Sequence, residues 1–108
     1  MLYLNYPNVV SPEVRIGVDY DGVSFCGLPS SLREALSPPI VAIFNVLQRD
    51  FPMLEQICVD GMVSEGGGEC NFAAFDIYML FPYGGAFLGM ERARNLFSEF
   101  GLKHYVLS

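Results

Sequence analysis

Histidine occurs once in this chain, cysteine three times, and lysine and arginine together only six times among 108 residues. So few basic residues argue against duplex DNA or an anionic membrane as a partner, because both are bound by clustered Lys and Arg that replace counterions. One histidine, His104, beside scattered cysteines lacks the paired ligand spacing of a zinc site. No recognised catalytic motif is present. We therefore expect no metal, no cofactor and no catalytic residue, and an enzyme is the less favoured class.

The cysteines, Cys26, Cys58 and Cys70, are odd in number and form no CxxC pair. The first six residues lack the basic stretch of a signal peptide, and Pro7 interrupts the segment. A reducing cytoplasm is the simplest location for such a chain. We expect the thiols to act there as small hydrophobic side chains rather than as disulfides or metal ligands.

The chain is rich in apolar residues. Hydrophobic residues make up 52% of the sequence, and charged residues only 17%, against about 25% in typical soluble domains. The length predicts one domain spanning residues 1–108. A domain of this size buries a limited fraction of its surface, so the excess predicts an exposed apolar patch for a partner or a homodimer.

Negative charge is unevenly distributed. The net charge is −6. Residues 1–70 contain nine acidic and three basic side chains, whereas residues 71–108 contain three of each. The first two-thirds of the chain therefore carries the whole net charge.

The N-terminal part predicts strands. Residues 2–6 have β-forming composition, and Pro12 is expected to close the loop after them. Apolar side chains then alternate strictly over residues 14–20, the pattern of a strand with one buried face. Asp21-Gly22 suits a two-residue hairpin turn in which both positions favour positive φ, and residues 23–26 form the return strand.

Helices are expected next. Ser31 and Glu34 fit a capping box that begins a short helix ending near Ser37. Pro38-Pro39 should stop that helix and open a second one, which is apolar on nearly every side and extends to about Asp50.

The second half predicts more sheet. Asp60-Gly61 within residues 56–64 is either a second hairpin turn or part of a strand that continues to the glycine-rich tip at residues 65–69. Residues 72–81 form a long apolar strand, best placed at the centre of the sheet and covered on both faces. A last helix comes after Gly84-Gly85, and its apolar positions are Phe87, Met90, Ala93, Phe97 and Phe100.

Gly101 should end that helix in the left-handed conformation, and residues 104–107 should return as a closing strand. The fold class is therefore α+β, a single domain with a mixed or mainly antiparallel sheet and two or three helices packed on one face.

Residues 72–90 carry one charge, Asp76, and are almost long enough to span a bilayer. Asp76, Pro82 and the glycine pair interrupt such a span, which favours a core strand and a packing helix. Gly84-Gly85 matches neither phosphate-loop pattern, although Arg92 and Arg94 lie shortly after it. We expect a plain turn there.

The remaining signal is an acidic surface with tyrosines, the residues that anchor interfaces. Carboxylates around such anchors steer a basic partner toward them. The predicted partner-binding residues are Asp19, Tyr20, Asp21, Asp60, Glu65 and Glu69. These features favour a small acidic protein that masks a basic protein surface, as an immunity protein or antitoxin inhibits a toxin such as a nuclease.

Two other classes remain. One is a dimeric ligand-binding or enzymatic domain with a site between the long strand and the last helix, which requires Cys70, Asp76 or His104 to lie together. The other is a structural subunit without independent activity.

Overall fold

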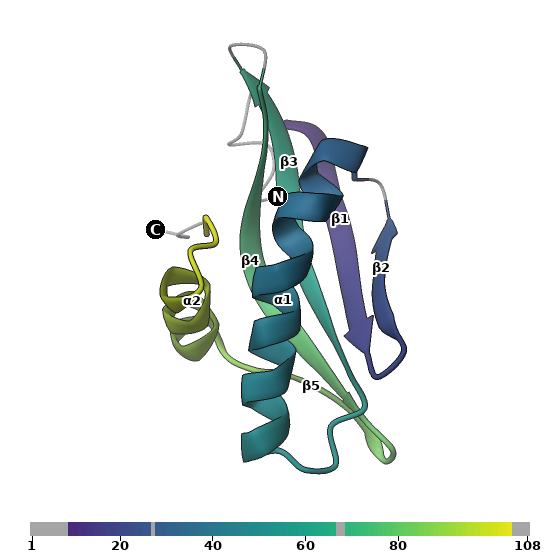
Figure 1. The fold of residues 1–108 in the computed structure, drawn as a ribbon. Coiled ribbons are helices and arrows are strands. Elements are labelled where there is room, and N and C mark those ends of the chain that lie inside the picture. Colours follow the sequence, from purple (N-terminus) through teal and green to yellow (C-terminus); the bar gives the residue numbers. More distant parts are fainter. Residues whose placement is uncertain (1–8, 27, 67–68, 105–108) are drawn as a thin grey trace.

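A computed structural model describes residues 9–26, 28–66 and 69–104, which form one five-stranded sheet and two helices (Figure 1). The strand order is β2-β1-β3-β4-β5, and every neighbouring pair is antiparallel. The elements are β1 (Val9–Asp19), β2 (Gly22–Cys26), α1 (Ser30–Asp50), β3 (Gln56–Gly66), β4 (Glu69–Phe81), β5 (Gly84–Phe87) and α2 (Met90–Glu99). The predicted α+β class with an antiparallel sheet is confirmed.

β1 is longer than predicted. It begins at Val9 and runs through Pro12, where a loop was expected. Its pairing with β3 shifts register on both sides of Ser11, so the ladder is irregular where proline cannot donate a hydrogen bond. The strand predicted at residues 2–6 lies outside the described residues.

The predicted β1–β2 hairpin is confirmed, but its turn residues are one position earlier than expected. Asp19 pairs with Gly22, so Tyr20 and Asp21 form the two-residue turn. The Asp19 carboxylate accepts hydrogen bonds from the amides of Asp21, at 2.8 Å, and Gly22, at 3.2 Å. Within the described residues positive φ occurs only at glycine, here at Gly22 with φ 138°, so Asp21 avoids the conformation that the predicted turn required.

α1 is one helix of 21 residues that passes through Pro38 and Pro39, so the prediction of two separate helices is wrong. Each proline removes an intrahelical donor and normally breaks a helix. The apolar face nevertheless continues across the two prolines, because Leu36, Ile40 and Leu47 are all buried. The predicted cap at Ser31 is also absent, since Pro29 occupies the N-cap and no side chain bonds there.

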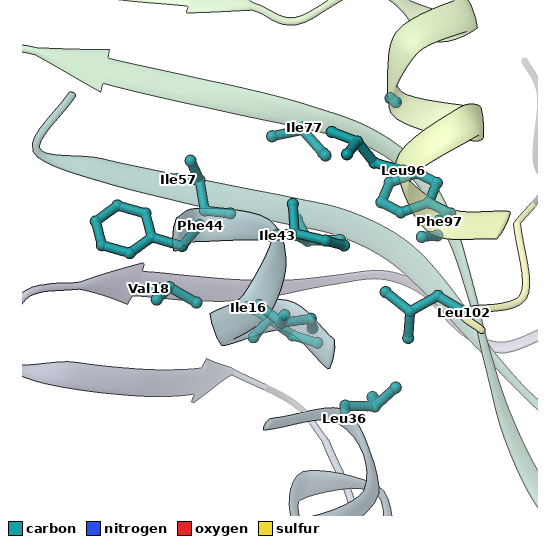
Figure 2. Close-up of a cluster of buried hydrophobic side chains, with 14 of the residues drawn as sticks. Ile16, Val18, Leu36, Ile43, Phe44, Ile57, Ile77, Leu96, Phe97 and Leu102 are labelled. Carbon is teal, nitrogen blue, oxygen red and sulfur yellow. The ribbon is translucent and has the colours of Figure 1, made fainter. Parts of the chain in front are cut away.

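Both helices pack on the same face of the sheet (Figure 2). Alternate residues of β1, β3 and β4 point toward them, as the pairing of Ile16 with Val59 and of Val59 with Ile77 shows. α2 contributes Ala93, Leu96 and Phe97 to the same core. The opposite side, called here the outer face, carries the side chains between these positions. Neither described helix combines the length and apolarity needed to cross a bilayer.

β3, not β4, is the central strand, which corrects the predicted position of the long apolar segment. Asp60-Gly61 lies inside β3 with a bulge opposite it in β4, so the alternative of a continuous strand is the correct one. The Phe72 ring packs over Gly61, where an added Cβ would lie 2.4 Å from the ring. Gly61 is thus a site of close approach rather than a turn.

Gly84-Gly85 does not lead into the last helix, as predicted, but begins the short edge strand β5. An added Cβ at Gly85 would lie 2.3 Å from the Tyr78 hydroxyl, so the tyrosine ring lies across the glycine. Phe87 therefore belongs to the strand, and α2 starts only at Met90, after Gly89 with φ 103°.

The predicted left-handed Gly101 is confirmed, with φ 75°. His104 makes one isolated parallel bridge to Ala74, and the rest of the predicted closing strand lies outside the described residues.

Candidate functional site

Three connections meet at one end of the sheet: the β1–β2 turn, the α1–β3 loop and the β4–β5 turn (Figure 1). The strand register places the three connections side by side. Asp19 pairs with Gln56, Gln56 with Leu80, and Leu80 with Gly85. The residues just beyond these positions share one edge of the molecule. We call this edge, with Asp19–Gly22, residues 49–55 and residues 81–84, the loop end.

Large exposed apolar side chains gather at the loop end. Among the described residues, Tyr20 is 69% exposed, Met53 58% and Tyr83 77%, and each belongs to a different one of the three connections. Phe87, 59% exposed, lies nearby on β5. Tyr20 was a predicted partner-binding residue. Tyr83 was one of the tyrosines considered as interface anchors but was not assigned to the site, and Met53 was not predicted. The missed signal was a proline followed by a large apolar residue between elements, at Pro52-Met53 and Pro82-Tyr83.

Tyr20 is both exposed and fixed in position. Its ring meets Phe44 edge-on with centroids 5.8 Å apart, and its hydroxyl donates to the Leu54 carbonyl at 3.2 Å. The Gln48 amide of α1 bonds to the same hydroxyl and, at 3.1 Å, to the Leu54 carbonyl. The turn is therefore tied to α1 and to the α1–β3 loop, which makes the loop end a preorganised surface.

The loop end carries net negative charge. Its acidic residues are Asp19, Asp21, Asp50 and Glu55, and its basic residue is Arg49. Arg92 of α2 reaches it and forms an ion pair with Asp50. Three carboxylates thus remain against one arginine, around the exposed Tyr20, Met53 and Tyr83.

The predicted partner-binding residues do not form one patch. Asp19, Tyr20 and Asp21 lie together in the β1–β2 turn, whereas Glu65 and Glu69 belong to the opposite end of the β3–β4 hairpin. β3 runs from Gln56 to Gly66, so the two ends are about 33 Å apart. The side chains of Glu65 and Glu69 lie outside the described part of the structure.

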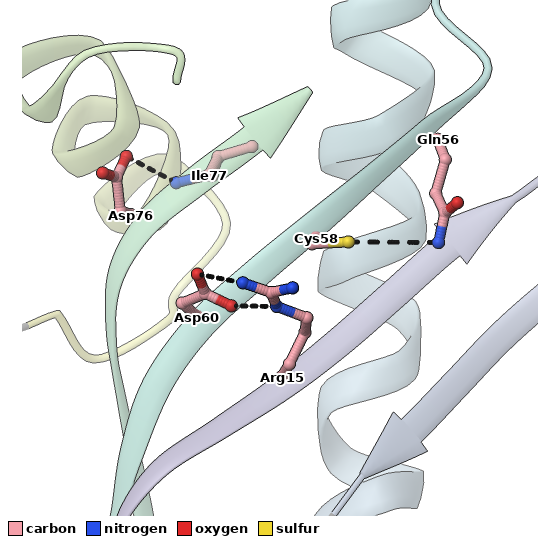
Figure 3. Close-up of polar contacts among 6 residues, drawn as sticks. All are labelled: Arg15, Gln56, Cys58, Asp60, Asp76 and Ile77. Carbon is pink, nitrogen blue, oxygen red and sulfur yellow. Dashed lines mark hydrogen bonds and ion pairs between the residues drawn. The ribbon is translucent and has the colours of Figure 1, made fainter. Parts of the chain in front are cut away.

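Asp60, the remaining predicted residue, lies at the middle of the outer face (Figure 3). The Arg15 guanidinium of β1 donates to its carboxylate through Nε at 2.7 Å and Nη2 at 3.2 Å. The Arg15 side chain is 61% exposed and that of Asp60 21%. A cation of the same chain thus already neutralises Asp60, which makes it a weaker attachment point than the turn carboxylates.

Asp76 is the direct cross-strand partner of Asp60. Its carboxylate accepts a hydrogen bond from the Ile77 amide at 2.7 Å (Figure 3). Partial burial raises the pKa of Asp76, the Ile77 hydrogen bond lowers it, and the nearby negative charge of Asp60 raises it further. Two carboxylates and one arginine therefore form a row across three strands.

Cys58 is buried on the outer face, 3.9 Å from the Gln56 side-chain nitrogen. Burial raises the pKa of this thiol, Arg15 lowers it, and Asp60 raises it. The protonated thiol is favoured, which fits the expected role as a small hydrophobic side chain and not that of a nucleophile. The side chains of Cys26 and Cys70 lie outside the described residues.

A second candidate is the groove beside α2, of about 420 Å³, lined by Glu91, Arg94, Asn95, Ser98 and His104. The Ser98 hydroxyl and His104 Nε2 lie 3.1 Å apart, but the buried Nδ1 of His104 has no hydrogen-bond partner among the described residues. Among the residues that the structure describes, none orients His104 as the third group of a nucleophilic triad would.

The residues of the ligand-binding alternative are not seen as a cluster. Asp76 bonds to Ile77 and faces Asp60, whereas His104 contacts Ser98 of α2. Within the described ranges, no group of three or more His, Cys, Asp or Glu side chains is arranged to hold a metal ion.

Comparison with known proteins adds no functional information. No protein-family model matches this chain, and a search of the curated proteins finds no match.

Proposed function

We propose that this chain is a binding protein whose loop end masks a basic surface of a partner protein. The observation that carries the proposal is the placement of Tyr20, Met53 and Tyr83, from three separate connections, on one acidic edge of the sheet. Interfaces combine apolar and aromatic anchors at the centre with polar groups around them.

The charge at this edge specifies the partner. Asp19, Asp21 and Glu55 attract a cationic surface at long range, and the apolar side chains exclude water once contact is made. Asp19 also accepts two amide hydrogen bonds of the turn, so its charge is presented from a fixed position. A basic toxin such as a nuclease is one class of protein with the required surface, and an inhibitory, immunity-like role follows from covering it.

A random peptide library displayed on phage tests the proposal. We expect the selected sequences to be enriched in Arg and Lys together with large apolar residues. Binding of the selected peptides should weaken strongly between about 0.05 M and about 0.5 M sodium chloride, because the attraction is electrostatic and exposed. Selection of sequences without basic residues would overturn the proposal.

Two variants locate the binding surface. Met53→Ser and Asp21→Asn change exposed side chains of the loop end. Each should weaken binding of the selected peptides by about fivefold or more. Glu34→Gln and Glu99→Gln each remove one negative charge, as Asp21→Asn does, from exposed positions on the helices away from the three connections, and serve as its matched controls. An equal loss of peptide binding in these controls would attribute the effect of Asp21→Asn to net charge rather than to its position at the loop end.

A further inference from the structure

Four side chains form a continuous row at the loop end, in the order Arg92, Phe51, Phe81 and Tyr83. The Arg92 guanidinium carbon lies 5.6 Å from the centre of the Phe51 ring. Phe51 meets Phe81 edge-on, with centroids 6.0 Å apart and an interplanar angle of 70°. Phe81 stacks on Tyr83 at 5.2 Å with an interplanar angle of 8°. The row begins at a cation and ends at an exposed aromatic ring.

The terminal ring is held in place although it is 77% exposed. Phe51 and Phe81 are partly buried against the core, so the base of the row is rigid. Pro82 separates Phe81 from Tyr83 and restricts the backbone between the two stacked rings. A ring presented in this way loses little conformational freedom when a second group stacks on it.

The surrounding charge decides which group fits. A nucleic-acid base could also stack on an exposed tyrosine, but its phosphate would meet the carboxylates of Asp19, Asp21 and Glu55 at this end. The Glu55 amide donates to the Leu80 carbonyl at 2.9 Å, which places this residue beside the end of β4. A cation with a flat face is favoured by both the ring and the charge.

We propose that the exposed face of Tyr83 is a stacking site for an arginine side chain of the partner. The incoming guanidinium extends the row at its outer end, as Arg92 closes it at the inner end. The inference rests on the proposed binding function and deepens it by naming the chemical group recognised. Arginine is preferred to lysine because its planar, weakly hydrated guanidinium stacks on aromatic rings.

Nuclear magnetic resonance with defined peptides tests this site directly. The probes are three short peptides of identical sequence except that the cationic position is arginine, lysine or the neutral isostere citrulline. We expect the ring signals of Tyr83 to shift most with the arginine peptide, less with lysine and least with citrulline. Equal shifts for the arginine and citrulline peptides would overturn the assignment.

Substitutions of Tyr83 distinguish stacking on its aromatic face from apolar contact with a side chain of similar size. Tyr83→Leu keeps an apolar side chain but has no π face, and should weaken binding of the arginine peptide by about fivefold. Tyr83→Phe keeps the face and should retain the affinity. An unchanged affinity in Tyr83→Leu would rule the stacking site out. Circular dichroism of both variants should match the wild type, because the residue is largely exposed.

The two proposals fail in different ways. If phage-selected basic peptides depend on Met53 and Asp21 but not on Tyr83, the binding function stands and the stacking site is refuted. If the arginine peptide binds at Tyr83 but the phage selection yields no basic sequences, the stacking site stands and the protein-masking function is refuted.

Discussion

Asp60 of β3 and Asp76 of β4 are direct cross-strand partners, and Arg15 of β1 donates two side-chain hydrogen bonds to Asp60. Like charges placed directly opposite one another in a sheet are destabilising. The arginine compensates the Asp60 carboxylate, whereas Asp76 relies on the amide of Ile77. The repulsion between the two carboxylates therefore disfavours mainly the ionised form of Asp76.

Asp76→Asn should stabilise the protein at neutral pH. Folding raises the pKa of Asp76, so the folded state holds the proton more tightly than the unfolded state. Stability of the wild type therefore falls as the pH rises from below the ordinary aspartate pKa through the raised value. Asparagine carries no charge and keeps an oxygen for the Ile77 amide. We expect similar free energies of unfolding at about pH 3 and a more stable variant at about pH 7.

Urea titrations at both pH values measure this difference. An equal increase in the free energy of unfolding of Asp76→Asn at both pH values would contradict the assignment to ionisation of Asp76. Glu34→Gln, at an exposed position of α1, is the control. A gain of equal size there would attribute the effect to the net charge of the chain.

Arg15→Gln should destabilise the protein by about 1 kcal/mol, the upper range for an ion pair with an exposed partner. The variant leaves the carboxylates of Asp60 and Asp76 facing one another without the Arg15 charge. The double variant Arg15→Gln/Asp60→Asn removes the repulsion as well and should recover much of the loss. A double-mutant cycle in urea isolates the coupling between the two residues. Additive losses would show that the pair contributes nothing.

Gly61→Ala should cost about 2 kcal/mol, because the new methyl group would overlap the Phe72 ring and the Ala73 carbonyl oxygen. Gly17→Ala is the matched control on the neighbouring strand. Its methyl group would meet only the side-chain ends of Ser24 and Gln56, at 2.9 and 3.0 Å, and both can move aside. Thermal unfolding of the two variants should rank Gly17→Ala as clearly more stable. The reverse order would contradict the close approach at Gly61.

Pro38→Ala should raise the free energy of unfolding by about 1–2 kcal/mol, because it restores a helix donor and removes the clash of the proline ring. This gain exceeds the opposing effect of a more flexible unfolded chain. Pro38 is exposed, so little packing is lost. Pro29→Ala changes the N-cap, whose carbonyl accepts from Leu32 and Arg33 in either variant and whose nitrogen needs no intrahelical acceptor, and should have a smaller effect. Urea titration and helix content by circular dichroism measure both. A destabilised Pro38→Ala would show that the ring makes a favourable contact.

Periodic patterns in the sequence predicted structure better than single turn residues did. The alternation over residues 14–20 located the second half of β1, and the hairpin to β2 followed from it. Pro38-Pro39 does not divide the helix and Gly84-Gly85 does not lead into one, although both were predicted. Asp60-Gly61, for which a turn and a strand were both considered, lies inside β3. Pro38-Pro39 and Asp60-Gly61 lie in segments with buried neighbouring side chains, and that burial outweighs the local preference. Gly84-Gly85 lies in an exposed strand that pairs with β4. The spacing of Leu36, Ile40, Ile43 and Leu47 across the prolines was the signal that favoured one helix.

The candidate site was predictable only in part. Asp19, Tyr20 and Asp21 follow from a hairpin that the sequence shows directly. Their proximity to Met53 and Tyr83 depends on strand order, because β1, β3 and β4 must be neighbours before the three connections can meet. Asp60 was predicted as a partner-binding residue, and its pairing with Arg15, which depends on the same long-range register, was not predicted.

The position of β1 between β2 and β3 also bears on how the chain assembles. β2 is its immediate neighbour in sequence, whereas β3 reaches it only after the whole of α1. The β1–β2 hairpin and the β3–β4–β5 meander are thus two locally connected units joined along one seam, at which Ile16 meets Val59 and Arg15 meets Asp60. Closing that seam is the slow, long-range step expected to set the folding rate.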